Sequence, residues 1–137
     1  MHVDEIMSPQ VYTVAPSDTV LRAEETMNRE HIRHLPVVDG DVLVGLVTQR
    51  DIMAASIPPI SVPSEEDDLD AKNRMRVEKI MRGFVETVRP ETDAIAAADR
   101  MLELKIGCLP VLDERHKVVG IVTEADYVRL ARDMLRQ

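Results

Sequence analysis

Aromatic side chains are almost absent from this sequence: its 137 residues include two tyrosines, one phenylalanine and no tryptophan. Such a chain has too few rings to build a stacking platform for single-stranded nucleic acid. Basic residues are also in deficit, because 17 lysines and arginines face 25 aspartates and glutamates, which gives a net charge of −8. Since phosphate neutralisation needs an excess of positive charge on some surface, nucleic acid is not an expected partner. A local basic cluster could still bind one small anion.

Long apolar runs and cysteine pairs are missing as well. No apolar run approaches the ~20 residues that a membrane-spanning helix needs, so no membrane partner is expected. The start, MHVDEIMSP, lacks the basic segment and apolar core of a secretory signal. Cys108 is the single cysteine and cannot form an internal disulfide, which is typical of a reducing compartment. These absences predict a cytoplasmic protein.

Catalytic and metal-binding patterns are not found either. The sequence has no arrangement typical of a Ser-His-Asp or Cys-His nucleophile and no phosphate-binding glycine loop, so neither an enzyme nor a catalytic residue is predicted. The four histidines show no metal-ligand spacing with one another or with Cys108: His2, His31, His34 and His116. No metal site is expected among them.

An internal repeat is the main positive feature of the chain. Aligning residues 3–39 with 77–113 gives 14 identities in 37 pairs. Unrelated sequences of this composition would give roughly two or three. After a one-residue insertion the match continues, and "GLVTQRD" at 45–51 returns as "GIVTEAD" at 120–126. The chain is therefore a tandem duplication.

Each copy begins with a short apolar segment and a helix. The segments "VYTV" and "VETV" are expected to be strands, and each ends at a proline. Apolar residues at helical spacing follow in both copies. Ser17 or Asp18 is expected to cap the first of these helices, and Thr92 or Asp93 the second.

Two β-rich runs and a closing helix complete each copy. In the first copy the runs are joined by Asp39-Gly40-Asp41, a hairpin signal. The closing helix is expected to begin after Thr48 in the first copy and after Thr123 in the second. The predicted order is β-α-β-β-α in each copy, an α/β (α+β) fold class.

A segment of different composition separates the copies. Residues 57–72 contain three prolines and an acidic run, which predicts an exposed linker. A divalent-cation site on these carboxylates is an alternative, although no calcium-loop spacing appears. The predicted organisation is a first repeat at 1–56, a linker at 57–72 and a second repeat at 73–137.

The repeated Thr-x-x-Asp has two interpretations. In the first, threonine caps the closing helix and aspartate favours its first turn, as Thr48 with Asp51 and Thr123 with Asp126. In the second, the glycine three residues ahead of each threonine lets another group approach the backbone, and the helix N-terminus binds a polar ligand. A carboxylate there can accept hydrogen bonds from both hydroxyls of a ribose. The two roles can coexist.

The duplication, the order "LPVVD" to "VGLVT-x-x-D" and the leading "V-x-x-I-M" resemble the cystathionine-β-synthase (CBS) domain family. The resemblance covers nearly the whole chain apart from the linker and implies a CBS pair, or Bateman module, in a stand-alone protein. It implies two copies packed sheet to sheet about a pseudo-twofold axis, with two equivalent clefts. It also implies a homodimer that regulates an effector protein, which the sequence does not identify. The implied ligand is an adenosyl compound: AMP, ADP, ATP or S-adenosylmethionine.

The same resemblance implies the residues of each cleft. In the family, one copy provides the ribose-binding threonine and aspartate, and the other provides its first short strand and the residues next to Leu-Pro. One expected cleft combines Thr123 and Asp126 with the following residues of the first copy: Tyr12, Thr13, Val14, Arg33, His34 and Pro36. The other combines Thr48, Arg50 and Asp51 with the following residues of the second copy: Val85, Val88, Gly107, Cys108 and Pro110.

The two expected clefts differ in charge. "IRHLP" offers a permanent cation, Arg33, and a titratable one, His34, for the phosphates of a ligand. The matching "IGCLP" offers neither, and its Cys108 is expected to be a small buried residue rather than a nucleophile. The alternative for the basic pair is an ordinary helix exit, where the helix dipole favours positive residues.

Two functions from different classes stay open. One is a regulatory nucleotide-binding module that senses its ligand and changes dimer or partner geometry. The other is a structural dimerisation adaptor whose clefts are vestigial. The two aspartates favour the sensor, since a vestigial site has no need of them. A symmetric homodimer is expected because apolar surface should remain on the helices bearing four methionines: Met27, Met53, Met101 and Met134.

Overall fold

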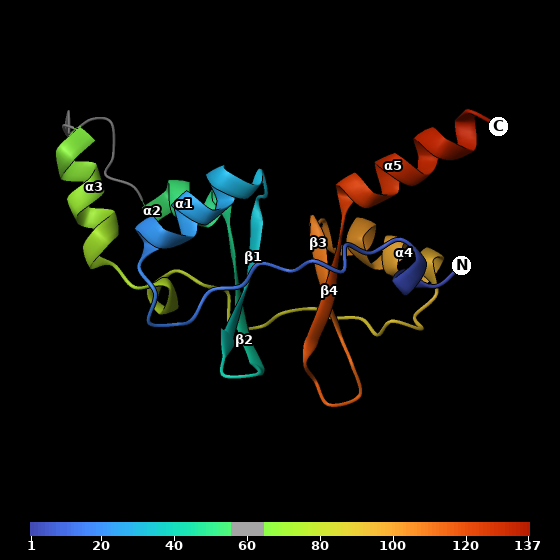
Figure 1. The fold of residues 1–137 in the computed structure, drawn as a ribbon, viewed down its shortest axis with the longest axis horizontal. Helices are drawn as coiled ribbons and strands as arrows, with labels where there is room; N and C mark the ends of the chain where they lie inside the picture. Colours follow the sequence, from blue (N-terminus) through green and yellow to red (C-terminus); the bar gives the residue numbers. More distant parts are fainter. Residues whose placement is uncertain (56–64) are drawn as a thin grey trace. The chain divides into compact units, whose positions relative to one another are not determined.

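The computed structural model describes residues 1–55 and 65–137 (Figure 1). It contains helices and two two-stranded antiparallel sheets, so the predicted α/β class is confirmed. In chain order the elements are η1 (Val3–Glu5), α1 (Val20–Glu30), β1 (His34–Asp39), β2 (Val42–Thr48), α2 (Gln49–Ala55), α3 (Glu65–Arg74), η3 (Val77–Lys79), α4 (Ala94–Leu104), β3 (Cys108–Leu112), β4 (Val118–Thr123) and α5 (Glu124–Leu135). Within the described residues, no helix is both long enough and apolar enough to cross a membrane.

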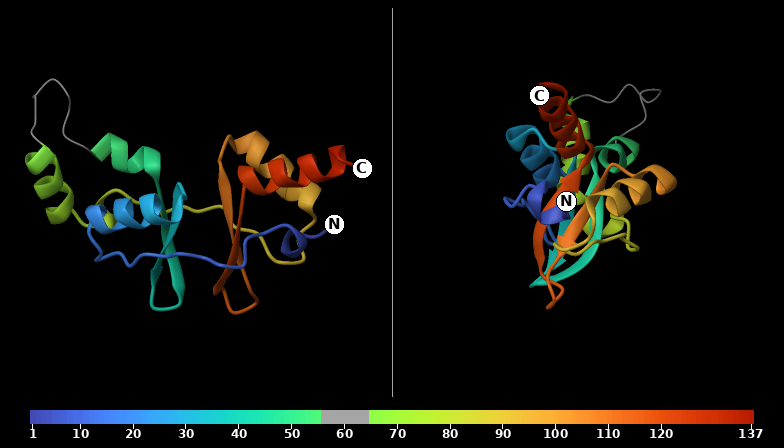
Figure 2. Two further views of the ribbon diagram at one scale, coloured as in Figure 1. Left: turned by 45° about the horizontal axis from the view of Figure 1, so that its top comes forward. Right: turned by 90° about the vertical axis from the view of Figure 1, so that its right-hand side faces the viewer.

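The chain forms two compact units. The first, here called the middle unit, is Tyr12–Val85 and contains the β1–β2 hairpin. The second, here called the split unit, joins Met1–Val11 to Glu86–Gln137 and contains the β3–β4 hairpin. In each unit, helices lie at the end of the hairpin opposite its turn (Figure 2).

Both hairpins have the same register. In the middle unit His34 pairs with Thr48, and in the split unit Cys108 pairs with Thr123. The turn of the first hairpin contains Gly40 at φ 63°, a left-handed conformation that glycine adopts without steric cost, so the predicted turn signal is confirmed. The register brings the residues ahead of each Leu-Pro beside the threonine that precedes the closing helix.

The short apolar segments at the start of each copy do not form full strands. Each makes a single parallel bridge, Val14 with Val37 and Val88 with Val111. The prediction of a strand was therefore wrong in extent. Two residues beyond each bridge stands a proline, whose missing N–H ends the ladder.

The N-terminal caps of α1 and α4 were predicted correctly for only one of the two helices. Thr19 caps α1 by accepting from Arg22 N at 3.1 Å, so the choice of Ser17 or Asp18 was wrong. Asp93 caps α4 by accepting from Ile95 N at 2.8 Å, which confirms that choice. Thr19 and Asp93 occupy equivalent positions of the two copies, and both side chains offer the oxygen acceptor that a helix start needs.

The leading segment of the chain packs against the second repeat. Val3 N donates to Thr92 O at 2.8 Å, and Ser8 pairs with Ile121 of β4. The side chain of Val3 is fully buried in the core of the split unit. This segment is therefore part of the split unit, although it begins the first repeat.

The equivalent segment of the second repeat packs in the same way against the first. Val77 N donates to Asp18 O at 2.8 Å, and Arg82 pairs with Leu46 of β2. Val77 is fully buried in the core of the middle unit. Each repeat thus gives its leading segment to the unit built around the other repeat's hairpin.

Part of the expected linker is helical. Residues 57–64 lie outside the described residues, but α3 covers 65–74 and so includes the last eight residues of the expected linker. Acidic residues begin the helix, and Lys72 and Arg74 occupy its last turn, an order that the helix dipole favours. Lys72 Nζ pairs with Glu24 Oε2 of α1 at 2.8 Å. The helix is therefore tied to the middle unit.

The four methionines expected on exposed helices divide into two groups. Met27 and Met101 belong to the two cores and are 3% and 6% exposed, so they add no apolar surface to the helices that bear them. Met53 and Met134 are 69% and 62% exposed. The helical spacing of Met27 and Met101 placed them on the faces that cover the hairpins.

Candidate functional site

The threonine and aspartate of the middle unit form a reciprocal cap at the start of α2. Thr48 N donates to Asp51 Oδ2 at 2.8 Å, and the Thr48 hydroxyl lies 2.9 Å from the same oxygen. Asp51 N donates back to Thr48 Oγ1 at 3.2 Å. The capping interpretation of Thr-x-x-Asp is confirmed for this copy.

The split unit repeats this geometry at the start of α5. Thr123 N donates to Asp126 Oδ2 at 2.8 Å, and the Thr123 hydroxyl lies 3.3 Å from that oxygen. The return bond from the backbone of Asp126 to the threonine side chain is also present. In both copies the cap uses only one carboxylate oxygen, Oδ2.

The second oxygen of each aspartate, Oδ1, meets a cation instead of the helix backbone. Asp51 Oδ1 lies 3.4 Å from Arg82 Nε. Asp126 Oδ1 accepts from Arg129 Nη2 in a short contact, and from the Ser8 hydroxyl at 3.3 Å. The Asp126 side chain is 2% exposed and that of Asp51 is 14% exposed. A buried carboxylate, Asp126, and a half-buried one, Asp51, each with a permanent cation beside it, can hold a polar ligand by exchange of partners.

The arginines and Ser8 were missed by the sequence analysis. Ser8 and Arg82 are equivalent in the alignment of the two copies, which signals a shared position next to the aspartate. Arg129 stands three residues after Asp126, a spacing at which side chains meet on a helix. Both signals are present in the sequence. The equivalence of Ser8 and Arg82 can be interpreted only once the leading segment is known to lie beside the closing helix of the other copy.

The glycines ahead of each threonine do admit another group to the backbone, as expected. A Cβ on Gly45 would lie 2.5 Å from Met81 Sδ and 3.0 Å from Arg82 O. A Cβ on Gly120 would overlap Met7 Sδ. The approaching group within the described residues is the methionine of "V-x-x-I-M", so the two most repeated motifs of the sequence are a matched pair. The glycine positions the leading segment, and with it Ser8 or Arg82.

The residues ahead of Leu-Pro lie at the same end of their hairpins as the caps. Gln49 N donates to Arg33 O at 2.9 Å, and Glu124 N donates to Gly107 O at 3.1 Å. These carbonyls therefore accept from the first residue of each closing helix. The register pairs His34 with Thr48, and Arg50 stands in the first turn of the helix that follows, α2. Gly107 and Cys108 occupy the matching place beside Thr123.

Cys108 is buried, as the sequence led us to expect. It is 3% exposed. Burial, with a smaller effect from the charge of Glu124, raises the pKa of the Cys108 thiol to about 12. A thiol that stays protonated is a poor nucleophile, so Cys108 is a packing residue.

The remaining predicted residues mostly form the walls of the cores. Pro36 and Pro110 are fully buried, and their carbonyls accept from Val14 N and Val88 N at 3.1 Å. Those two valines are buried as well, whereas Val85 is half-buried and Thr13 is exposed.

Tyr12 is tied to the end of α1. A hydrogen bond with the Glu30 carboxylate raises the pKa of the Tyr12 hydroxyl, with smaller contributions from burial and from the Glu30 charge. The pKa of Glu30 is lowered in turn, first by Arg29 and then by Tyr12. Tyr12 also packs against the core of the middle unit. Its ring is therefore held by both a polar and an apolar contact.

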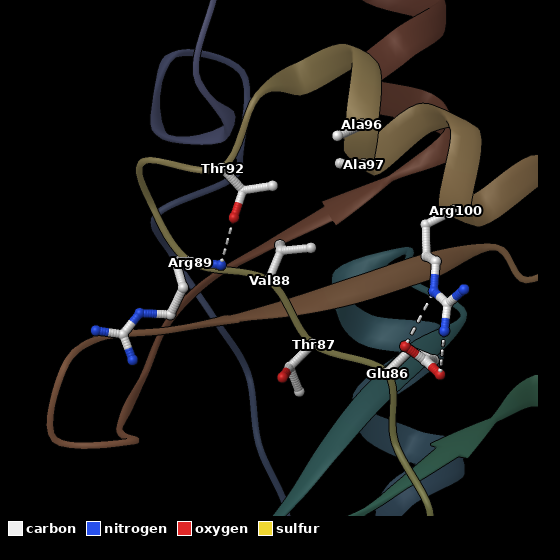
Figure 3. A pocket seen from close by; sticks show the side chains of 8 residues that line it. All are labelled: Glu86, Thr87, Val88, Arg89, Thr92, Ala96, Ala97 and Arg100. Carbon is white, nitrogen blue, oxygen red and sulfur yellow. Dashed lines mark hydrogen bonds and ion pairs between the residues drawn. The ribbon is translucent and has the colours of Figure 1, made fainter.

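A separate cavity of about 300 Å³ opens in the split unit between residues 86–92 and α4 (Figure 3). The Arg100 guanidinium lies across one side of it and pairs with the Glu86 carboxylate at 3.1 and 3.3 Å. Of the predicted ligand-binding residues only Val88 lines it, and neither Thr123 nor Asp126 does. Among the described residues, no group of three or more His, Cys, Asp or Glu side chains could hold a metal ion.

Comparison with known protein families gives one match. The model of the CBS domain matches residues 3–58 and 77–133, which are the two repeats. The chain is 33% identical over 129 residues to a CBS domain-containing protein of Dictyostelium discoideum, a match that covers 93% of this chain and 89% of that protein. By contrast, the chain spans 24% of a homoserine O-acetyltransferase from Methanohalobium evestigatum and 25% of an inosine-5′-monophosphate dehydrogenase from Methanocaldococcus jannaschii. Identities to these longer proteins are 34% and 31%.

Solved structures show the same fold. A CBS domain pair in complex with 5′-methylthioadenosine and S-adenosyl-L-methionine is similar with a TM-score of 0.81 and 30% identity over 98% of both chains. The structure of CBSX2 in complex with AMP is similar with a TM-score of 0.79 and 31% identity over 97% of both chains.

Proposed function

Because the chain belongs to the CBS domain family and both of its repeats are matched, we propose that it is a regulatory module that binds an adenosyl ligand of the AMP, ADP, ATP or S-adenosylmethionine class. The observation that carries this proposal is the different use of the two oxygens in each aspartate. Oδ2 of Asp51 and Asp126 accepts the capping hydrogen bonds, while Oδ1 faces a cation. An oxygen that the helix does not need can accept ribose hydroxyls.

The ligands of similar proteins support this class of compound. One similar structure contains 5′-methylthioadenosine and S-adenosyl-L-methionine, and another contains AMP. These ligands share an adenosine and differ in what the ribose carries at its 5′ position. A site built on ribose recognition would accept all of them, and a neighbouring charge would then select among them.

Arg33 and His34 are the proposed phosphate-binding groups. Arg33 is exposed, and within the described part of the chain no ion pair involves it. A permanent cation without a carboxylate partner can bind phosphate without first breaking an ion pair. The matching residues of the second repeat, Gly107 and Cys108, carry no charge, so phosphate preference should differ between the two ribose sites.

Association of two copies is the second part of the proposal. Four apolar side chains of the split unit are between 66% and 84% exposed: Ile95 and Leu102 on α4, and Val128 and Leu135 on α5. Each pair is separated by seven residues, which places its members on one face of their helix. A homodimer that buries these faces is proposed, and this surface also favours a dimerisation adaptor as the alternative function.

The proposed role is regulation of an effector protein and not catalysis. The homoserine O-acetyltransferase and the inosine-5′-monophosphate dehydrogenase that resemble this chain are about four times its length, and their activities belong to those whole proteins. A single reduced cysteine, buried and unreactive, fits a reducing compartment, and the cytoplasm is the proposed location.

A thermal-shift titration tests ligand binding directly. The panel is adenosine, AMP, ADP, ATP and S-adenosylmethionine, with GMP as the control for nucleotides in general. A ligand at 100 times its dissociation constant should stabilise the fold by about 2.7 kcal/mol. The double variant Asp51→Ala/Asp126→Ala should lose the shift. A chain that forms dimers in sedimentation but responds to no adenine compound would be an adaptor instead.

Arg33→Ala tests the phosphate assignment. It should weaken AMP binding by roughly 1.5–3 kcal/mol, the size of a lost charge-assisted hydrogen bond, and leave adenosine binding unchanged. The loss should shrink at high salt, because Arg33 is exposed. Arg115→Ala, an exposed arginine of the β3–β4 turn, is the matched control. Equal AMP affinity in wild type and Arg33→Ala would show that Arg33 and His34 only follow a helix end and do not bind phosphate.

A further inference from the structure

We propose that Arg129 is a specificity-determining residue, which competes with the ribose of the ligand for Oδ1 of Asp126 and so makes this site select phosphorylated adenosyl ligands. This inference rests on the proposed function, because it assumes that Asp126 binds a ribose. Arg129 lies outside the Thr-x-x-Asp motif. The motif is the same at Asp51 and Asp126, so Arg129 predicts a difference in ligand preference between these two sites.

The Asp126 carboxylate has no free acceptor position in this structure. Oδ2 accepts from the Thr123 backbone and lies near its hydroxyl, while Oδ1 accepts from Arg129 and Ser8. The side chain is 2% exposed. A ribose hydroxyl can therefore reach this carboxylate only by replacing a partner that is already present.

Arg129 is the partner that can leave. Its side chain is 54% exposed, so the guanidinium can rotate into solvent without opening the core. The cap does not depend on it, because the first copy has Ala54 at the equivalent position and forms the same 2.8 Å bond from threonine N to aspartate Oδ2. Neither backbone geometry nor packing requires the ion pair.

Displacement has a charge consequence. When a neutral ribose hydroxyl replaces Arg129 at Oδ1, the guanidinium loses its counter-ion beside a ligand. A phosphate on that ligand restores an anionic partner, whereas adenosine does not. The exchange therefore costs more for a nucleoside than for a nucleotide.

At the Asp51 site the cation should compete less strongly with a ribose than Arg129 does at Asp126. Its cation is Arg82, which approaches Oδ1 through Nε at 3.4 Å, the long end of hydrogen-bond distances. The Asp51 side chain is 14% exposed, and no second hydroxyl corresponds to Ser8, because Arg82 itself occupies the equivalent position. Adenosine should meet less resistance at Asp51.

The test isolates the Asp126 site in an Asp51→Asn background and compares Arg129→Gln with Arg132→Gln. Arg132 is one turn along the same helix, is 53% exposed and pairs with Asp133, so it is a matched control. Adenosine and AMP are titrated calorimetrically against each protein. Arg129→Gln should bind adenosine more tightly, and the ratio of AMP to adenosine affinity should fall about tenfold, the effect of roughly one charge-assisted hydrogen bond. Arg132→Gln should leave this ratio unchanged.

The possible failures are distinguishable. If the Asp51→Asn protein binds both ligands and Arg129→Gln keeps the wild-type ratio, Arg129 does not compete and the inference is overturned. If Arg129→Gln weakens both ligands equally and lowers the melting temperature, Arg129 only positions Asp126, which also overturns it. If the wild-type chain binds neither adenosine nor AMP, the proposed function itself fails. Should the background variant not fold, a two-site fit of wild type and Arg129→Gln gives the same ratio.

Discussion

The middle and split units are built from two copies of one sequence, yet the surroundings of their aspartates differ. In the middle unit the cation beside Asp51 comes from the leading segment of the other repeat, as Arg82. In the split unit that position is Ser8, and the cation, Arg129, comes from the same helix as Asp126. The two caps thus share their backbone geometry, but the cation beside Oδ1 comes from a different segment in each unit. Under the proposed function, the shared motifs define both ligand sites, and the unshared neighbours decide which ligand each site favours.

The residues ahead of Leu-Pro also differ in charge between the two copies. Arg33 and His34 can carry positive charge, whereas Gly107 and Cys108 cannot. Burial raises the pKa of the Cys108 thiol to about 12, which makes it less reactive. The polar position of one copy is therefore an apolar packing position in the other.

The thiol gives the largest expected effect. Raising the pKa from 9.0 to about 12 lowers the thiolate fraction at pH 8 by roughly a thousandfold. Native protein should thus react with an aromatic disulfide reagent far more slowly than protein in denaturant. The unfolded thiol loses its proton above pH 9 and the folded one does not, so the free energy of unfolding should fall between pH 9 and 12. Fast native labelling at pH 8 would show that Cys108 is accessible.

The exchange of leading segments gives the next largest effect. Val3 and Val77 are both fully buried, and truncating either to alanine should destabilise the protein by about 2 kcal/mol. Val3→Ala should reduce hydrogen-exchange protection in the β3–β4 hairpin, and Val77→Ala in the β1–β2 hairpin. The opposite assignment, with each valine protecting its own repeat, would contradict the two compact units.

The two glycines should respond unequally. Gly45→Ala would bring its Cβ against Met81 and also within 3.0 Å of the backbone oxygen of Arg82, which cannot easily move. Gly120→Ala would meet only the flexible side chain of Met7. Overpacking typically costs about 1–3 kcal/mol, and we expect Gly45→Ala at the upper end and Gly120→Ala at the lower. Urea unfolding of both variants measures the difference, and equal losses would argue against the backbone contact.

The smallest effect is a gain in stability at the helix ends. His31 and Lys105 follow α1 and α4 at equivalent positions, and both have φ 55°. Glycine adopts this left-handed conformation without the steric cost of a side chain, so His31→Gly and Lys105→Gly should each stabilise the protein by about 0.5–1 kcal/mol. Thermal denaturation would reveal the gain. A loss in only one variant would identify a side-chain contact in that unit.

The sequence analysis succeeded where the two copies agree. The duplication, the hairpins and the Thr-x-x-Asp caps were all predicted, because each depends on local spacing or on repetition. It failed where tertiary packing decides. The leading strands shrink to single bridges, and α3 extends into the expected linker because Lys72 and its neighbours can contact α1. Arg82 could not be assigned, since its proximity to Asp51 depends on a packing arrangement that pairs distant segments. Arg129 lies three residues after Asp126 on the same helix, and its spacing was overlooked.

The most direct measurement of the central claim is the stoichiometry of AMP binding to four proteins: wild type, Asp51→Ala, Asp126→Ala and the double variant. If both carboxylates bind a ribose, calorimetry should give two sites per chain in wild type, one in each single variant and none in the double variant. The site that remains in Asp51→Ala should show the stronger preference for AMP over adenosine. Unchanged AMP binding in the double variant would contradict the account, because the ligand would then bind without either aspartate.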